Sequence, residues 1–140
     1  MHGLVCLLHR GEAVSSEELS RSICTNPARV RKVMSKLHRA GLIEAGSGRG
    51  SGYSIKADGS RINLLEVLDA LGEEVLVPGW HSGGPDKDCL ISSGMGDVMD
   101  EVYGLLNTAC REKLGGITLG MIEHRNFTGE KEAAPCGKSY

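Results

Sequence analysis

Apolar side chains recur every three or four residues through the first 40 positions, which is the spacing of helices that bury one face. The first such stretch, 4–9, is stopped by Gly11, a residue type that commonly ends helices. The second stretch predicts a helix over about 16–24. It follows a capping-box sequence, because Ser15 precedes Glu18 by three residues. Two short helices are therefore expected at the start of the chain.

A longer amphipathic helix is predicted over 27–40. Asn26 is a favourable N-cap, and Pro27 suits the first helical position because its missing N–H would have no partner there. One face of this helix is apolar and comprises Val30, Val33, Leu37 and Ala40. The other faces contain no acidic residue and carry Arg29, Arg31, Lys32, Lys36, His38 and Arg39.

A β-hairpin is expected next. Short strands over 42–45 and 53–55 flank residues 46–52, in which Gly occupies alternate positions. This loop is not a phosphate-binding loop, because it lacks the G-x-x-x-x-G-K-[S/T] pattern and is followed by a strand rather than a helix. Two short helices, a basic helix and a Gly-rich hairpin together predict a winged helix-turn-helix, with 46–52 as the wing. The expected fold is mainly α with this small β-hairpin.

The second half of the chain predicts a different organisation. Asn63 can cap a helix over 64–71, whereas the residues after it are poorly periodic and contain several Gly and Pro. A long helix is predicted over about 95–114, and a short one from Thr118 to about His124. We therefore expect a DNA-binding domain at 1–71, a linker or sensing loop at 72–94, a dimerisation arm at 95–125 and a disordered tail at 126–140.

The long helix carries more apolar residues than one face of a small domain needs. Because it lies beyond a linker, little of its own chain is available to cover it, and a second copy related by a twofold axis would do so. The alternative is that the apolar stripe packs back on its own domain. The expected dimer interface comprises Met95, Val98, Met99, Val102, Leu105, Leu106 and Cys110.

Charge is distributed unevenly along the chain. Residues 1–61 hold ten Lys and Arg against five Asp and Glu, a net charge of +5. Residues 62–140 hold six against thirteen, a net charge of −7. A basic half joined to an acidic half indicates a polyanion-binding module beside a part with another task.

The basic helix is therefore expected to enter the major groove of DNA, which admits an α-helix. Its start would present base-reading side chains, while Ser16 and Lys36 would contact phosphates, and Ser47 and Arg49 of the wing would approach the minor groove. The base-reading set is Asn26, Ala28, Arg29, Arg31 and Lys32. There are two alternatives to DNA binding. The basic face could simply be exposed to solvent, or it could bind another protein, although a protein-binding surface would usually carry charges of both signs. A dimer would bind a pseudo-palindromic site in double-stranded DNA.

Composition narrows the class of protein. The 140 residues are 40% hydrophobic, which suffices for one core, but no apolar run reaches the ~20 residues that cross a bilayer. The five cysteines show no zinc spacing and fit a reducing, cytoplasmic setting. Cys6, Cys24 and Cys110 fall on apolar faces of predicted helices, where free Cys packs as a small hydrophobe. No Ser/His/Asp or Cys/His spacing indicates an enzyme.

Several segments together resemble the BadM/IscR/NsrR/CymR-type family of bacterial transcription regulators, over about 4–123. The resemblance is closest to members without a cluster. It implies a homodimeric DNA-binding regulator, usually a repressor, whose long C-terminal helix forms the dimer interface. The segments are Val14–Leu19, Asn26–Val33, Leu37–Ile43, Gly50–Tyr53, Ile62–Val67 and Gly116–Gly120.

The resemblance also bears on cofactors. Cluster-binding members carry three cysteines before the long helix, and here only Cys89 remains, because the other two positions fall near Val77 and Gly83. A His ligand of some relatives would fall at Ser92. No iron–sulfur cluster is therefore expected, since one thiolate cannot hold it. The alternative is a thiol redox sensor switched through Cys89. In the family about one helical turn precedes the position of Leu4, so this sequence starts later than the resemblance implies.

Overall fold

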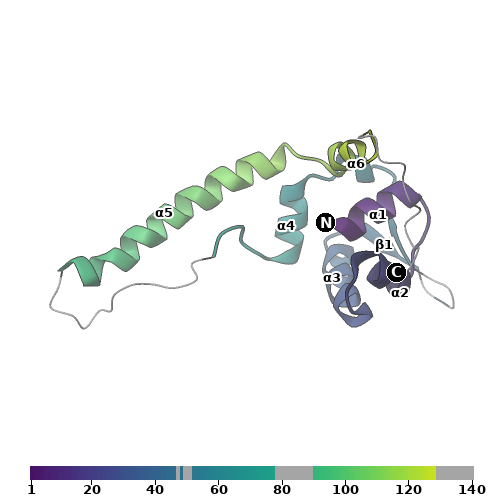
Figure 1. Ribbon diagram of the computed structural model, residues 1–140, viewed down its shortest axis with the longest axis horizontal. Coiled ribbons are helices and arrows are strands. Elements are labelled where there is room, and N and C mark those ends of the chain that lie inside the picture. Colours follow the sequence, from purple (N-terminus) through teal and green to yellow (C-terminus); the bar gives the residue numbers. More distant parts are fainter. Residues whose placement is uncertain (47, 49–51, 78–89, 129–140) are drawn as a thin grey trace.

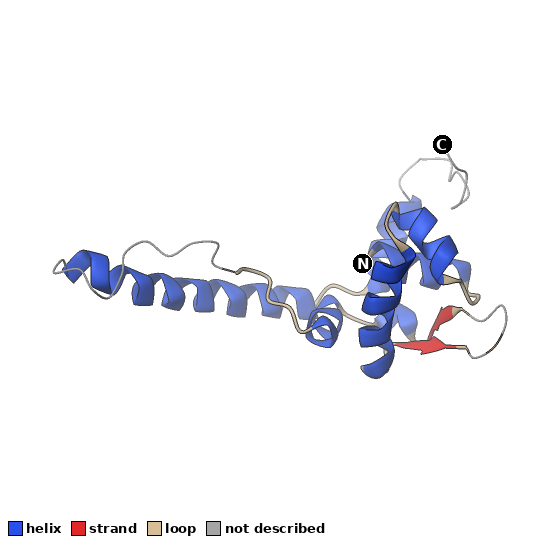
Figure 2. Ribbon diagram, turned by 90° about the horizontal axis from the view of Figure 1, so that it is seen from below, coloured by secondary structure: helices blue, strands red, loops and turns tan. Residues whose placement is uncertain are grey.

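The computed structural model describes residues 1–46, 48, 52–77 and 90–128, and within 90–93 only the backbone. It is mainly helical with one two-stranded antiparallel hairpin, as predicted (Figures 1 and 2). The elements in chain order are α1 (His2–Arg10), α2 (Ser16–Ile23), α3 (Pro27–Arg39), β1 (Ile43–Ala45), β2 (Tyr53–Ile55), a 3₁₀ turn η1 (Gly59–Arg61), α4 (Leu64–Leu71), α5 (Leu90–Gly115) and α6 (Leu119–Thr128).

The helix ends follow the predicted capping residues. Gly11 ends α1 with a left-handed backbone at φ 62°. The capping box of α2 is complete, because the Ser15 hydroxyl accepts from the Glu18 N–H at 3.2 Å and Glu18 accepts from the Ser15 N–H at 3.1 Å. At the start of α3, the Asn26 side chain accepts from the Ala28 N–H at 2.7 Å. Local sequence signals therefore account for the end of α1 and for the starts of α2 and α3.

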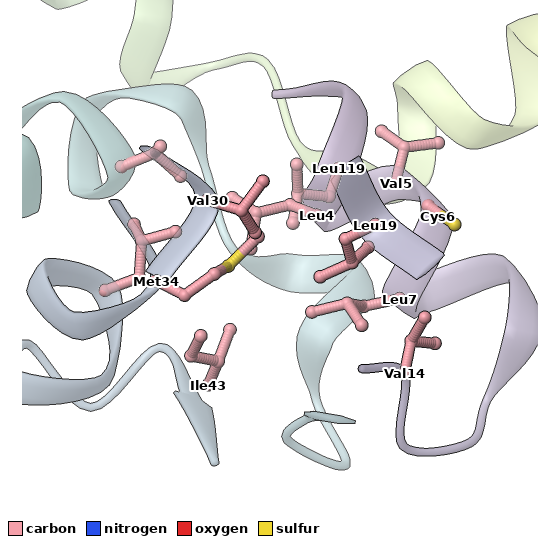
Figure 3. Close-up of a cluster of buried hydrophobic side chains, with 12 residues drawn as sticks. Leu4, Val5, Cys6, Leu7, Val14, Leu19, Val30, Met34, Ile43 and Leu119 are labelled. Atoms are coloured by element: carbon pink, nitrogen blue, oxygen red, sulfur yellow. The ribbon is translucent and has the colours of Figure 1, made fainter. Parts of the chain in front are cut away.

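The hydrophobic core is aliphatic and is formed mainly by α1, α2 and α3, and it includes Ile43 and Leu119 (Figure 3). One expectation for α3 is wrong, because Met34 rather than Val33 faces this core. Met34 is 3% exposed and Val33 is 37% exposed. Met34 packs next to α1, where a Cβ on Gly3 would lie 2.9 Å from its terminal methyl group. Val30 and Leu37 are buried as predicted, whereas Ala40, also expected on the apolar face, is exposed at the end of the helix.

The hairpin is joined to the domain through the turn that precedes α2. Val14 and Tyr53 exchange two backbone hydrogen bonds of 2.9 Å, so Val14 lies alongside β2. A Cβ on Gly52 would meet the Val14 backbone at 2.5 Å. Gly52 is therefore required by the close approach of two backbones, and the hairpin is fixed at its base.

The last helix is not part of a separate arm. Helix α6 lies beside α1 and η1 (Figure 1), and Leu119 at its start is 0% exposed within the core. The preceding residues form a bridge between Asn63 and Thr118. This long-range pairing returns the chain to the first domain, which the sequence division at 95–125 missed. Residues 126–128, predicted to be disordered, continue α6, and 129–140 lie outside the described residues.

Helix α5 begins at Leu90, five residues earlier than predicted, and extends away from the other helices over 26 residues (Figure 1). Its first residues were assigned to a loop because residues 72–94 are poorly periodic and contain several Gly and Pro. No helix among the described residues is long and apolar enough to cross a membrane.

The cysteines occupy different environments. Cys6 is buried in the core as expected, and Cys110 is half-buried on α5. Cys24 is exposed, contrary to the expectation, because it ends α2 in a left-handed conformation at φ 56° instead of continuing the apolar face. Cys89 and Cys136 lie outside the described residues.

Candidate nucleic-acid interface

Helices α2 and α3 pack against each other and leave one face of α3 open. Its buried face carries Val30, Met34 and Leu37, which fixes how the helix is rotated. The residues predicted to read bases are all exposed near its start, namely Asn26, Ala28, Arg29, Arg31 and Lys32. Because the helix has no acidic residue, this face presents only cationic and neutral groups. Such a face is complementary to the phosphates and guanine edges of DNA.

Arg31 is held by the helix before it. Its Nε donates to the Ser16 hydroxyl at 3.1 Å, and its Nη2 lies 3.0 Å from the Glu17 carboxylate. Ser16 in turn donates to Glu17 at 3.1 Å. The side chains of Arg31 and Glu17 are 56% and 59% exposed, so water weakens their attraction. Glu17 was not recognised from the sequence as a functional residue, because its partner is 14 positions further along.

Two acidic residues occupy the first turn of α2. Hydrogen bonds from the backbone and from Arg31 and Ser16 lower the pKa of Glu17 below its ordinary value. The pKa of Glu18 is lowered too, chiefly by the Ser15 N–H and then by the Ser15 hydroxyl. Both carboxylates therefore stay ionised at neutral pH. The predicted phosphate contact at Ser16 would consequently form beside a fixed negative charge.

Lys36 lies in a different place from the other basic residues. Its ammonium donates to the Leu71 carbonyl at the end of α4 at 2.6 Å and lies 3.9 Å from the Glu73 carboxylate. In the DNA-free protein its ammonium thus contacts α4, and a contact of Lys36 with a phosphate stays a prediction. This contact could not be predicted from the sequence, because it joins residues 35 positions apart.

The base of the wing is well defined. The Gly46 N–H donates to the Gly52 carbonyl at 2.9 Å, which closes the hairpin below its tip. Glu44 and Ala45 pair with Ser54 and Tyr53 in the antiparallel register. Ser47 and Arg49, the predicted minor-groove residues, lie outside the described residues.

Comparisons with known proteins agree with this arrangement. The Rrf2 family profile, described as an iron-dependent transcriptional regulator, matches residues 1–125. The chain is 28% identical over 124 residues to YwnA of Bacillus subtilis, which is named as an HTH-type transcriptional regulator; the match covers 89% of this chain and 92% of YwnA.

Solved structures share the fold. A transcriptional regulator from Lactobacillus plantarum superposes with a TM-score of 0.70 at 23% identity, covering 91% of this chain and 87% of its own. CymR, the global cysteine regulator of B. subtilis, gives a TM-score of 0.58 at 17% identity, covering 88% and 91%. The resemblance predicted from the sequence is therefore confirmed: the chain belongs to the Rrf2 family of bacterial winged-helix transcriptional regulators.

Proposed function

We propose that the chain is a homodimeric repressor that inserts α3 into the major groove and the 46–52 wing into the minor groove. The observation that carries this proposal is the exposed face of α3, which begins at Asn26 and holds basic residues without any acidic one. An α-helix of this kind fits the width of the major groove. A repressor would act by occupying DNA that the transcription machinery needs.

Specific recognition would come from the first turns of α3. Arg29 and Arg31 can each form two hydrogen bonds with guanine, whereas Lys32 can bond to guanine or a phosphate. For Arg31 this requires leaving Glu17 and Ser16. Because Arg31 and Glu17 are both more than half exposed, the exchange costs little compared with a bidentate contact to a base.

The dimer would form through α5. Six of its seven predicted interface residues are exposed, with Leu105 at 73% and Val98 at 55%, and Cys110 is half-buried. They recur along a helix that extends away from the domain. A continuous exposed apolar stripe is unfavourable in water and typical of a protein interface. A second copy related by a twofold axis would cover it and place two α3 helices on one face of DNA.

The residues present do not fit the iron–sulfur cluster of cluster-binding relatives. The described cysteines lie in the core of α1, at the end of α2 and on α5, and no three His, Cys, Asp or Glu residues of the described part approach one another closely enough to hold a metal. Only Cys89 stands in the segment that supplies cluster ligands in the family, and one thiolate cannot hold a cluster. We therefore propose regulation without a cluster. A visible absorption spectrum of protein purified without oxygen tests this, and cluster bands would contradict it.

A second candidate function is redox sensing through Cys89. The observation that favours it is that α5 begins at Leu90, the residue that follows Cys89 in the sequence. A thiolate next to a helix N-terminus would be stabilised. Asp86 and Asp88 in the sequence oppose this effect. If a Cys89→Ser variant still loses DNA affinity on treatment with peroxide, Cys89 is not the switch.

DNA binding is tested by fluorescence anisotropy with DNA from the region upstream of the protein's own gene. We expect affinity to fall steeply with salt, because phosphate contacts release counterions. Arg31→Ala should cost about 1–3 kcal/mol and relax specificity. The matched control is Arg125→Ala, which removes an exposed arginine on α6. Binding that ignores salt, or equal losses for both variants, would contradict the proposal.

A further inference from the structure

Helices α3 and α5 both form hydrogen bonds with one short segment of the chain, residues 69–77, which we name the 69–77 connection. It contains the end of α4 and the residues after it. Side chains from α3 and α5 donate to or accept from this segment, and most of these hydrogen bonds involve its backbone. Among the described residues, this is where the basic helix and the apolar arm are linked through hydrogen bonds to one common segment.

Lys36 holds the connection from the side of α3. Its ammonium donates to the Leu71 carbonyl at 2.6 Å and also lies 3.9 Å from Glu73. Gly72 ends α4 in a left-handed conformation and donates to the Leu68 and Asp69 carbonyls. The Leu71 carbonyl is thus a group at the negative end of α4, where a cation is favoured. Lys36 therefore stabilises the end of α4 and joins it to α3.

Asn107 holds the connection from the side of α5. Its side-chain oxygen accepts from the Leu76 N–H and its nitrogen donates to the Leu76 carbonyl, both at 2.9 Å. The carboxamide thus pairs with one residue as a neighbouring β-strand would. One turn further along α5, Arg111 donates to Asp69 at 2.7 Å. Two successive turns of α5 therefore bind both ends of the connection.

The C-terminal end of α5 is attached to the domain by other hydrogen bonds. The Leu64 N–H donates to the Ile117 carbonyl and the Leu119 N–H to the Ile62 carbonyl, both at 2.9 Å. These bonds fix a pivot just after Gly115, so the contacts of Asn107 and Arg111 decide the direction in which α5 leaves. At about 1.5 Å per residue, the middle of the apolar stripe lies roughly 20 Å from this pivot. A tilt of about 10° would move it by about 3.5 Å, close to the 3.4 Å rise of one base pair.

The geometry points to Lys36 and Asn107 as positioning residues that fix the angle between α3 and α5. In a dimer joined through α5, this angle sets the distance between the two α3 helices and thus the spacing of half-sites that the dimer accepts. The inference rests on the proposed function. It assigns to Lys36 a role in selecting operator geometry rather than a contact with DNA.

The test uses a duplex selected from a random pool by the full-length protein. The same duplex is then made with one or two base pairs inserted or removed at its centre. We expect the unmodified protein to bind each altered duplex at least tenfold more weakly. Asn107→Leu and Lys36→Met, which keep side-chain bulk, should bind all of them within about threefold of one another. The matched controls are Thr108→Val on α5 and Lys113→Met, an exposed lysine on the same helix; both should keep the tenfold discrimination.

The outcomes separate this inference from the proposed function. Failure of the unmodified protein to select any duplex contradicts the proposed function. If the unmodified protein selects a duplex, but Asn107→Leu and Lys36→Met both still bind the duplexes of altered spacing at least tenfold more weakly, the inference is overturned. The double variant should differ little from either single variant, because the two residues act on one connection, and additive losses would contradict this. If Asn107→Leu does not fold, Asn107→Asp removes the donor to Leu76 and keeps the acceptor.

Discussion

Replacing Glu17 with Gln should strengthen DNA binding. Glu17 holds Arg31 at 3.0 Å in the DNA-free protein, and its carboxylate would lie near phosphates once α3 enters the groove. The substitution removes the charge and keeps the shape. It does not disturb the capping box of α2, which uses Ser15 and Glu18. Folding should therefore be unaffected, and the change in affinity reports the competition for Arg31.

The size of the effect follows from exposure. Because both partners of the ion pair are more than half exposed, releasing Arg31 should favour binding by a factor of about 1.4 to 5. Removing a negative charge next to the phosphates adds an effect of similar size at low salt, since charges within about 10 Å are incompletely screened. We expect affinity to rise by a factor of about 2 to 25 at low salt and by less at high salt.

Fluorescence anisotropy over a range of salt concentrations measures this change. The matched control is Glu112→Gln, which removes the same charge from an exposed position on α5 and should change affinity less than about twofold. In an Arg31→Ala background, Glu17→Gln should lose the part of its gain that comes from releasing Arg31 and keep the part that comes from removing the negative charge. An unchanged or weaker affinity of a folded Glu17→Gln variant would refute the reasoning that Glu17 competes with DNA.

Three further predictions concern stability and assembly. Leu119→Ala should destabilise the protein by about 2–5 kcal/mol in denaturant unfolding, because Leu119 is fully buried in the core; a cost below 1 kcal/mol would show that α6 is not anchored there. Leu105→Glu should shift light-scattering mass from dimer to monomer without changing the helical signal, and a dimer that persists would exclude this face of α5. The pKa of Glu18 is lowered by folding from its ordinary value of 4.5, so its stabilisation is complete above that pH and is lost as pH falls below it. Glu18→Gln should weaken this acid dependence, and identical pH profiles would contradict the assignment.

Local features of the fold were predictable from the sequence. The capping box at Ser15, the Asn26 cap and the Gly-rich hairpin each depend on residues a few positions apart. Their physical signals are complete within one short segment, so the pattern alone defines the winged helix-turn-helix. The family resemblance was likewise carried by residues in these segments.

Features that depend on distant contacts were not predictable. The return of α6 to α1 requires the bridge between Asn63 and Thr118, and short apolar segments give no indication of where they will dock. In the sequence, Lys36 cannot be told apart from the other cations of the basic helix, and its contact with α4 is visible only in the structure. The pairing of Glu17 with Arg31 was missed for the same reason. The periodicity of apolar residues shows which faces of a helix are exposed. It does not show which distant residues those faces contact, and this requires the three-dimensional structure.

The central claim is that two α3 helices of one dimer lie in successive major grooves on the same face of DNA. Chemical footprinting of guanine N7 groups on the selected duplex tests it most directly, because these atoms line the major groove. We predict two protected clusters about 10 base pairs apart, both lost in Arg31→Ala. A single protected cluster, or protection confined to the minor groove, would contradict the claim.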